Sequence, residues 1–206
     1  MASLWKSLPG LFFITIMTTA IVGCASNPPG QSSAPALADS HVSPNLPLYQ
    51  GQAPYSTAFN EEKYRQKLPP RINTHDEKMV VVDPKQFAWG AYDADGDLIR
   101  AGIATAGADY CPDTKRPCHT TTGTFRIYAM RGEECISKTY PVGKGGSLMP
   151  YCMFFHNGES LHGTPDQMMN EANISHGCIH MRIPDAAWLQ QNFADVGTKV
   201  VILPYS

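Results

Sequence analysis

Charged residues and long apolar runs are both scarce in this sequence. Lys, Arg, Asp and Glu make up 17% of the 206 residues, whereas an ordinary globular domain has about 25%. The formal net charge is −2 and no basic run is present, so nucleic acid is not an expected partner. The apolar stretch at residues 11–22 is shorter than the roughly 20 residues that a transmembrane helix needs. The hydrophobic fraction of 43% allows one ordinary domain with appendages.

Two ligand-binding patterns are present only in part. The glycine-rich run at 143–146 lacks the spacing of a P-loop and a following Ser/Thr-capped helix, which argues against a phosphate site. Asp93, Asp95 and Asp97 alternate as in a calcium loop, but Ala104 stands where that loop needs glutamate. We therefore interpret residues 93–97 as a hairpin turn.

The N-terminus has the character of a targeting segment. Lys6 precedes the apolar stretch, which runs into Ile-Val-Gly and then Cys24. This sequence resembles a bacterial lipobox, in which the cysteine is lipidated. An ordinary secretory leader with an incidental cysteine is the alternative. We expect a signal peptide at 1–23 and a lipid anchor on Cys24 at the periplasmic side of a membrane. Ala25 favours the outer membrane, by resemblance to Gram-negative lipoproteins.

Residues 24–77 are interpreted as a tether and lead-in to the domain. The part from 26 to 54 is rich in Pro, Ser, Ala, Gly and Gln, a composition that stays extended and cannot bury a core. One or two helical turns are predicted at 61–68, because Pro69 and Pro70 would stop a helix there.

Residues 78–206 predict a mainly β domain. Short β-type runs occur at 79–83, 86–92, 98–104, 125–130, 151–156, 160–162 and 199–203. Asn157-Gly158 is a strong hairpin signal. The clearest helix is predicted at 184–194, with Pro184 in its first turn and Leu189 and Phe193 on one face. We expect a compact β-sandwich or partly open barrel with one principal α-helix.

The chemistry-bearing stretch is Ser175-His176-Gly177-Cys178, preceded by His162-Gly163-Thr164. A thiol with an ordinary pKa near 8.5 is only a few per cent thiolate at neutral pH, and a histidine can act as the base that activates it. His162 lies 16 positions before Cys178, which suits two β segments whose ends bring imidazole and sulfur together. Gly177 would let a carbonyl approach backbone N–H groups that stabilise an oxyanion.

These two blocks resemble the signature of the L,D-transpeptidase catalytic domain, also called the YkuD-like domain. Residues 121–125 resemble the family's Thr-Pro-Thr-Gly-x-Phe segment, although Thr121 stands where proline is usual. Residues 149–151 resemble its Met-Pro-Tyr segment, and the resemblance covers about 78–204. The second residue after the cysteine is His180 rather than arginine or asparagine, and Arg182 is a nearby substitute.

The resemblance implies an enzyme that acts on peptidoglycan stem peptides. Cys178 would attack the carbonyl of a diamino acid, expel D-alanine and form a thioester that an acceptor amine resolves as a 3→3 crosslink. His162 would be the base, with Ser175, His176 and Gly177 shaping the site. No cofactor is required, and we expect a monomer. Candidate substrate-binding residues are Tyr151, His156, Gly163, His180 and Arg182.

Three other functions stay open at this point. Water could resolve the thioester, which would make the protein a carboxypeptidase or endopeptidase, and a protein lysine could be the acceptor. A non-catalytic wall-binding lipoprotein is a second class. Zinc binding is a third, since the chain is rich in candidate ligands, but their spacing matches no common zinc motif and we predict no metal site. These candidates are Cys152, His156, His162, His176, Cys178 and His180.

Four further cysteines are expected to form disulfides, because exported proteins usually meet an oxidising compartment. Of the three connectivities that four cysteines allow, we favour Cys111–Cys118 and Cys135–Cys152. Free buried thiols are the alternative.

Overall fold

The computed structural model describes residues 59–140, 143 and 146–206. All of them lie in one compact unit, residues 48–206. The predicted signal peptide, Cys24 and most of the tether lie outside the described residues.

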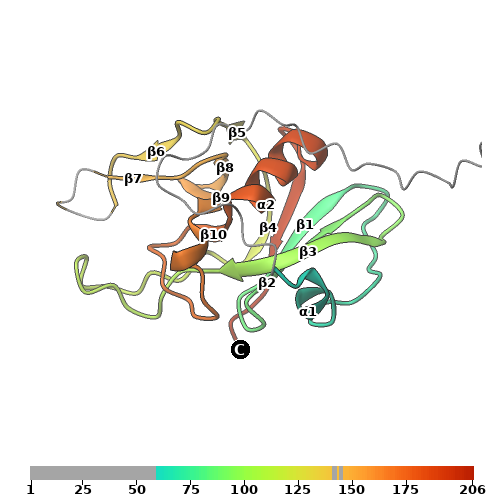
Figure 1. Cartoon of the computed structure of the whole chain (residues 1–206), viewed down its shortest axis with the longest axis horizontal. Coiled ribbons are helices and arrows are strands. Elements are labelled where there is room, and N and C mark those ends of the chain that lie inside the picture. Colours follow the sequence, from blue (N-terminus) through green and yellow to red (C-terminus); the bar gives the residue numbers. More distant parts are fainter. Residues whose placement is uncertain (1–58, 141–142, 144–145) are drawn as a thin grey trace, which may run out of the picture. The chain divides into compact units, whose positions relative to one another are not determined.

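Nine strands form one sheet in the order β4-β11-β1-β2-β3-β10-β9-β8-β5, and β6 and β7 form a separate two-stranded ribbon (Figure 1). The β1–β11 and β9–β10 pairs are parallel, and the other pairs are antiparallel. The strands are β1 Met79–Asp83, β2 Ala88–Tyr92, β3 Leu98–Thr105, β4 Gly123–Arg126, β5 Ala129–Met130, β6 Ile136–Ser137, β7 Ser147–Leu148, β8 Met153–His156, β9 Glu159–Thr164, β10 Ile179–Arg182 and β11 Lys199–Ile202.

The sheet curls because one stretch of chain supplies both of its edges. β4 and β5 stand at opposite ends of the strand order, yet only residues 127 and 128 separate them. The Ile127 N–H donates to Thr198 O at 3.0 Å, beside β11, whereas the Tyr128 N–H donates to Phe154 O at 2.8 Å, on β8. The single strand predicted at 125–130 is thus two strands, and the change of partner gives the partly open barrel that was expected.

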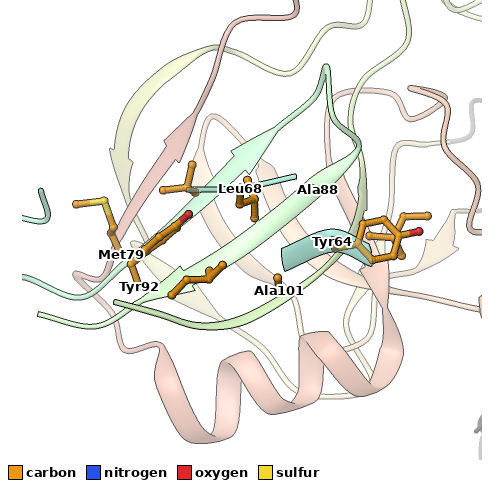
Figure 2. Close-up of a cluster of buried hydrophobic side chains, with 9 residues drawn as sticks. Tyr64, Leu68, Met79, Ala88, Tyr92 and Ala101 are labelled. Atoms are coloured by element: carbon orange, nitrogen blue, oxygen red, sulfur yellow. The ribbon is translucent and has the colours of Figure 1, made fainter. Parts of the chain in front are cut away.

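The segment before residue 78 packs onto one face of this sheet. Helix α1, Glu61–Arg65, begins after Asn60, whose side chain accepts a hydrogen bond from the Lys63 N–H. Tyr64 and Leu68 belong to one buried hydrophobic cluster with residues of β1–β3 that include Met79, Tyr92 and Ala101 (Figure 2). The described part of the lead-in therefore contributes to the same hydrophobic core as the sheet.

The principal helix begins where β10 ends. α2 spans Ile183–Trp188, with Pro184 in its first turn, and continues as a wider π-type turn, Leu189–Phe193. Leu189 and Phe193 are both buried, so they pack inward as the helix period predicted. Among the described residues, no helix is long and apolar enough to cross a bilayer.

A tight hairpin joins β8 to β9. Asn157 and Gly158 both adopt positive φ, 43° and 88°, as the mirror-image turns that match strand twist require. A β-bulge between Phe154 and His156 then shifts the register, so that Met153 pairs with Leu161. The hairpin therefore sets the position of His162, the next residue of β9.

Candidate active site

Parallel pairing of β9 with β10 brings the two sequence blocks together. His180 is the partner of His162, and Ile179 is the partner of Leu161. Cys178 directly precedes β10 and lies beside Ser160, whose hydroxyl donates to Cys178 Sγ at 3.7 Å. Cys178 and His162 line one cavity of about 730 Å³. The cysteine lies at a strand end, as predicted, whereas His162 lies within β9.

The tautomer of His162 follows from its neighbour. Its Nδ1 lies 2.9 Å from the Gly163 carbonyl oxygen, which can only accept, so Nδ1 carries the proton and Nε2 is the free acceptor. Burial lowers the pKa of His162 to about 4, against the opposing effect of the Gly163 carbonyl. The imidazole is thus neutral at pH 7 and can take up a proton.

Cys178 is held as a neutral thiol. Burial raises its pKa, and the Ser160 hydroxyl and backbone N–H partly oppose that effect. The nearby Glu159 carboxylate raises the pKa a little further. Because the thiol has a higher pKa than the imidazole, the resting pair is uncharged, and the thiolate forms only when a base removes the proton.

Ser175 fixes the turn that carries Cys178. Its Oγ accepts from the Gly177 N–H at 3.0 Å and donates to the Cys178 carbonyl. Gly177 has φ of 123°, which a side chain would strain, and its carbonyl accepts from Thr120 Oγ1 at 2.8 Å. Ser175 therefore shapes the turn. Because the Gly177 N–H already donates to Ser175, the Cys178 N–H is the one of these two backbone groups that remains a candidate to bind an oxyanion.

His176 has a different partner from His162. Its Nε2 lies 2.8 Å and 2.9 Å from the two carboxylate oxygens of Asp113, and Tyr140 stacks on its ring at 5.1 Å. Asp113 lies in the loop closed by the Cys111–Cys118 disulfide. Cys111, Asp113 and His176 form a cluster of metal-ligand types, but the disulfide removes the thiolate that a metal would need.

His180 contacts the predicted base. Its ring lies edge-on to His162 with centroids 4.9 Å apart. Burial lowers the pKa of His180 to about 3, and its buried Nδ1 has no hydrogen-bond partner among the described residues. The residue that departs from the family pattern therefore lies against His162 as well as lining the cavity.

Three of the five predicted substrate-binding residues lie outside the cavity lining. Arg182 is bonded to Asp166 at 2.9 Å and stacks on Phe59 at 4.1 Å. Tyr151 is buried, and Gly163 lies close to the start of α2. His156 and His180 do line the cavity.

Both favoured disulfides are present, Cys111–Cys118 and Cys135–Cys152. Cys118 lines the cavity. Cys135 and Cys152 form a small buried cluster against which Cys178 packs. One bridge therefore contributes to the cavity wall, and the other lies in the cluster against which Cys178 packs.

Sequence reasoning missed Ser160, Asp113 and Glu159. Ser160 could have been found from the pairing register, because it occupies the position level with Cys178. Asp113 gave no signal, since it lies 63 residues from its partner His176 in an irregular loop. Glu159 adjoins a turn in the sequence, and only the fold brings it to Cys178.

Comparison with known proteins agrees with this geometry. The model of the L,D-transpeptidase catalytic domain, YkuD, matches residues 77–202. The Bacillus subtilis (strain 168) protein named "Putative L,D-transpeptidase YciB" is 32% identical over 139 residues, covering 61% of this chain and 66% of YciB. The chain thus spans slightly less than two thirds of that relative.

Solved structures share the fold. An L,D-transpeptidase from Xylanimonas cellulosilytica DSM 15894 matches with a TM-score of 0.56 and 23% identity, covering 67% of this chain and 66% of that one. One from Stackebrandtia nassauensis matches with a TM-score of 0.54 and 21% identity, covering 70% and 66%. Because the family model covers more than half of the chain and the fold is that of solved members, the chain belongs to the L,D-transpeptidase catalytic domain family.

Proposed function

We propose that this protein is a cysteine-dependent L,D-transpeptidase acting on peptidoglycan stem peptides. The observation that carries the proposal is the placement of Cys178 and His162 in one cavity, with Nε2 of a neutral His162 free to accept a proton. A thiol beside an oriented base is the arrangement that nucleophilic acyl transfer needs. The family assignment supports L,D-transpeptidase activity.

In the acylation half, His162 Nε2 takes the Cys178 proton as sulfur attacks the carbonyl of the third residue of a tetrapeptide. The Cys178 N–H stabilises the oxyanion, an effect worth about 3 kcal/mol per donor in known cases. The imidazolium then gives its proton to the leaving amine of D-alanine, and the carbonyl carbon stays bonded to sulfur. His176 holds the turn through Asp113 and takes no proton from Cys178.

In the second half, an amine of another stem peptide attacks the thioester carbonyl. His162 accepts the proton of that amine and returns it to the departing sulfur, which restores the neutral pair. The new amide is the 3→3 crosslink. Water as the attacking group would instead yield a tripeptide, so exclusion of water from the cavity decides between crosslinking and hydrolysis.

The test is intact-mass spectrometry of the full-length chain mixed with purified disaccharide-tetrapeptide. We expect an acyl adduct that maps to Cys178, is lost in Cys178→Ala and forms at least 100-fold more slowly in His162→Ala. Folded protein that forms no adduct, while still binding cell-wall sacculi, would contradict the enzyme and leave a wall-binding function.

We also propose that Cys24 is lipidated and holds the domain at the periplasmic face of the outer membrane. Its support is the sequence pattern of residues 1–25. In a Gram-negative host, labelled palmitate should enter the wild-type chain and not Cys24→Ser. Unlabelled wild-type protein released as a soluble species would favour an ordinary leader.

A further inference from the structure

One acidic side chain faces the cavity beside the nucleophile. Among the described residues that line it, Glu159 is the one carboxylate, whereas Arg116 and Lys138 carry positive charge. A Cβ placed on Gly177 would lie 3.5 Å from Glu159 Oε1, so the carboxylate lies against the turn that carries Cys178. The mechanism described above gives this group no role.

The two carboxylate oxygens of Glu159 differ. Oε1 accepts from both the backbone N–H and the hydroxyl of Thr121, each at 3.1 Å. Oε2 is buried and has no hydrogen-bond partner among the described residues. A buried acceptor without a donor is costly, and it becomes satisfied if a ligand supplies the donor.

Thr121, which donates both hydrogen bonds to Glu159 Oε1, is a departure from the family's usual sequence. It stands where the family segment usually has proline, and proline has neither a backbone N–H nor a hydroxyl. Both donors that hold Glu159 Oε1 are thus present because residue 121 is threonine and not proline. Two positions 38 residues apart together place a carboxylate next to the nucleophile.

We propose that Glu159 binds the primary ammonium group on the side chain of the donor's diamino acid, a claim that rests on the proposed function. A carboxylate beside a cationic group keeps that group protonated. The amine that attacks the thioester must be neutral, so the ammonium held by Glu159 is one that does not react. Burial raises the pKa of Glu159, and a bound cation would keep its carboxylate ionised.

The test is calorimetric binding to the full-length chain carrying Cys178→Ala, which cannot be acylated. Disaccharide-tetrapeptide with a free side-chain amine should bind at least tenfold more tightly than the same molecule acetylated on that amine. Adding Glu159→Gln should make the two affinities equal. Adding Glu62→Gln, on the exposed surface of α1, should leave the tenfold preference unchanged.

Equal binding of the two ligands, binding of neither, or a preference that survives Glu159→Gln would overturn the proposal. Thermal unfolding of each variant checks that the fold is kept. The acylation experiment tests the proposed enzyme independently of the Glu159 site. An adduct on Cys178 together with no preference for the free amine contradicts only the Glu159 site. Amine-dependent binding without any adduct contradicts only the enzyme.

Discussion

At the scale of single residues, burial keeps both reacting groups uncharged. It raises the pKa of Cys178 and lowers that of His162 to about 4, because a charge inside the protein loses its hydration. The site therefore stores no thiolate. In the mechanism that we propose, proton transfer to His162 accompanies attack on the substrate, which protects the sulfur from reacting without a substrate.

The first prediction concerns the reactivity of Cys178 toward a small neutral reagent. Alkylation by iodoacetamide, followed by peptide mapping of Cys178, should keep increasing with pH beyond about pH 9, because the thiol pKa lies above its usual value. A rate that levels off by pH 7 would instead reveal a stored thiolate–imidazolium pair.

The second prediction concerns acid stability and His180. Burial lowers its pKa in the folded protein to about 3 from the ordinary value of 6.5, so between these pH values the unfolded chain binds a proton that the folded chain does not. The stabilisation is complete above about pH 6.5 and is lost as the pH falls toward 3. Protonation of His180 in the unfolded chain should alone lower the free energy of unfolding by about 2 kcal/mol as the pH falls from 7.5 to 5.

Urea unfolding at pH 7.5 and pH 5 measures this effect. His180→Asn cannot titrate, so its stability should fall less than that of the wild type over the same interval. Equal losses in the two proteins would show that His180 is accessible to protons in the folded state.

At the scale of elements, the active site depends on short connections held by side chains. The turn 175–178 lies outside the strands and is held by a backbone bridge at Ser175, by the two side-chain hydrogen bonds of Ser175 and by the Thr120 hydroxyl. The loop 111–118 is closed by a disulfide and contributes Asp113. Both connections position groups next to β9 and β10, which the sheet already holds in register.

The third prediction tests the Ser175 turn. Ser175→Ala should reduce kcat for tetrapeptide about 10- to 100-fold and lower stability by about 1–3 kcal/mol, because two buried backbone groups lose their partner. Ser175→Thr keeps the hydroxyl and should recover most of the activity. If alanine and threonine variants behave alike, the hydroxyl does not hold the turn.

The fourth prediction tests the loop 111–118. The double variant Cys111→Ser, Cys118→Ser should lose about 2 kcal/mol of stability, as expected for a bridge across seven positions. Its acylation rate should fall because Asp113 no longer holds His176. Differential scanning calorimetry and the Cys178 adduct rate measure the two effects. An unchanged adduct rate would mean that this loop does not support the site.

At the scale of the whole domain, local patterns predicted most strands and the helix, since period and turn residues are local signals. The Asn157-Gly158 turn was predicted correctly for this reason, whereas His162, predicted at the end of a strand, lies within β9. The break in the strand at 127–128 was missed because it depends on two different partners, β11 and β8, that are distant in sequence. The packing of Tyr64 and Leu68 on the sheet is likewise a long-range contact.

The candidate site also has features that the sequence predicted and others that depend on long-range contacts. Its motif residues were predicted because their spacing is distinctive, and the disulfide pairs were favoured correctly. The environments of Cys178 and His162 were not predictable, because burial and the positions of Ser160, Glu159 and His180 arise only when β9 pairs with β10. Arg182 illustrates the converse: it adjoins the motif in sequence but bonds to Asp166 away from the cavity lining.

The most direct measurement is product analysis of the full-length protein incubated with purified disaccharide-tetrapeptide, by liquid chromatography and mass spectrometry. The account predicts a dimeric muropeptide with a 3→3 crosslink and one released D-alanine per dimer, both absent with Cys178→Ala. Release of D-alanine with tripeptide as the sole product would contradict transpeptidation and identify a hydrolase. A crosslinked dimer that still forms with Cys178→Ala would contradict the assigned nucleophile.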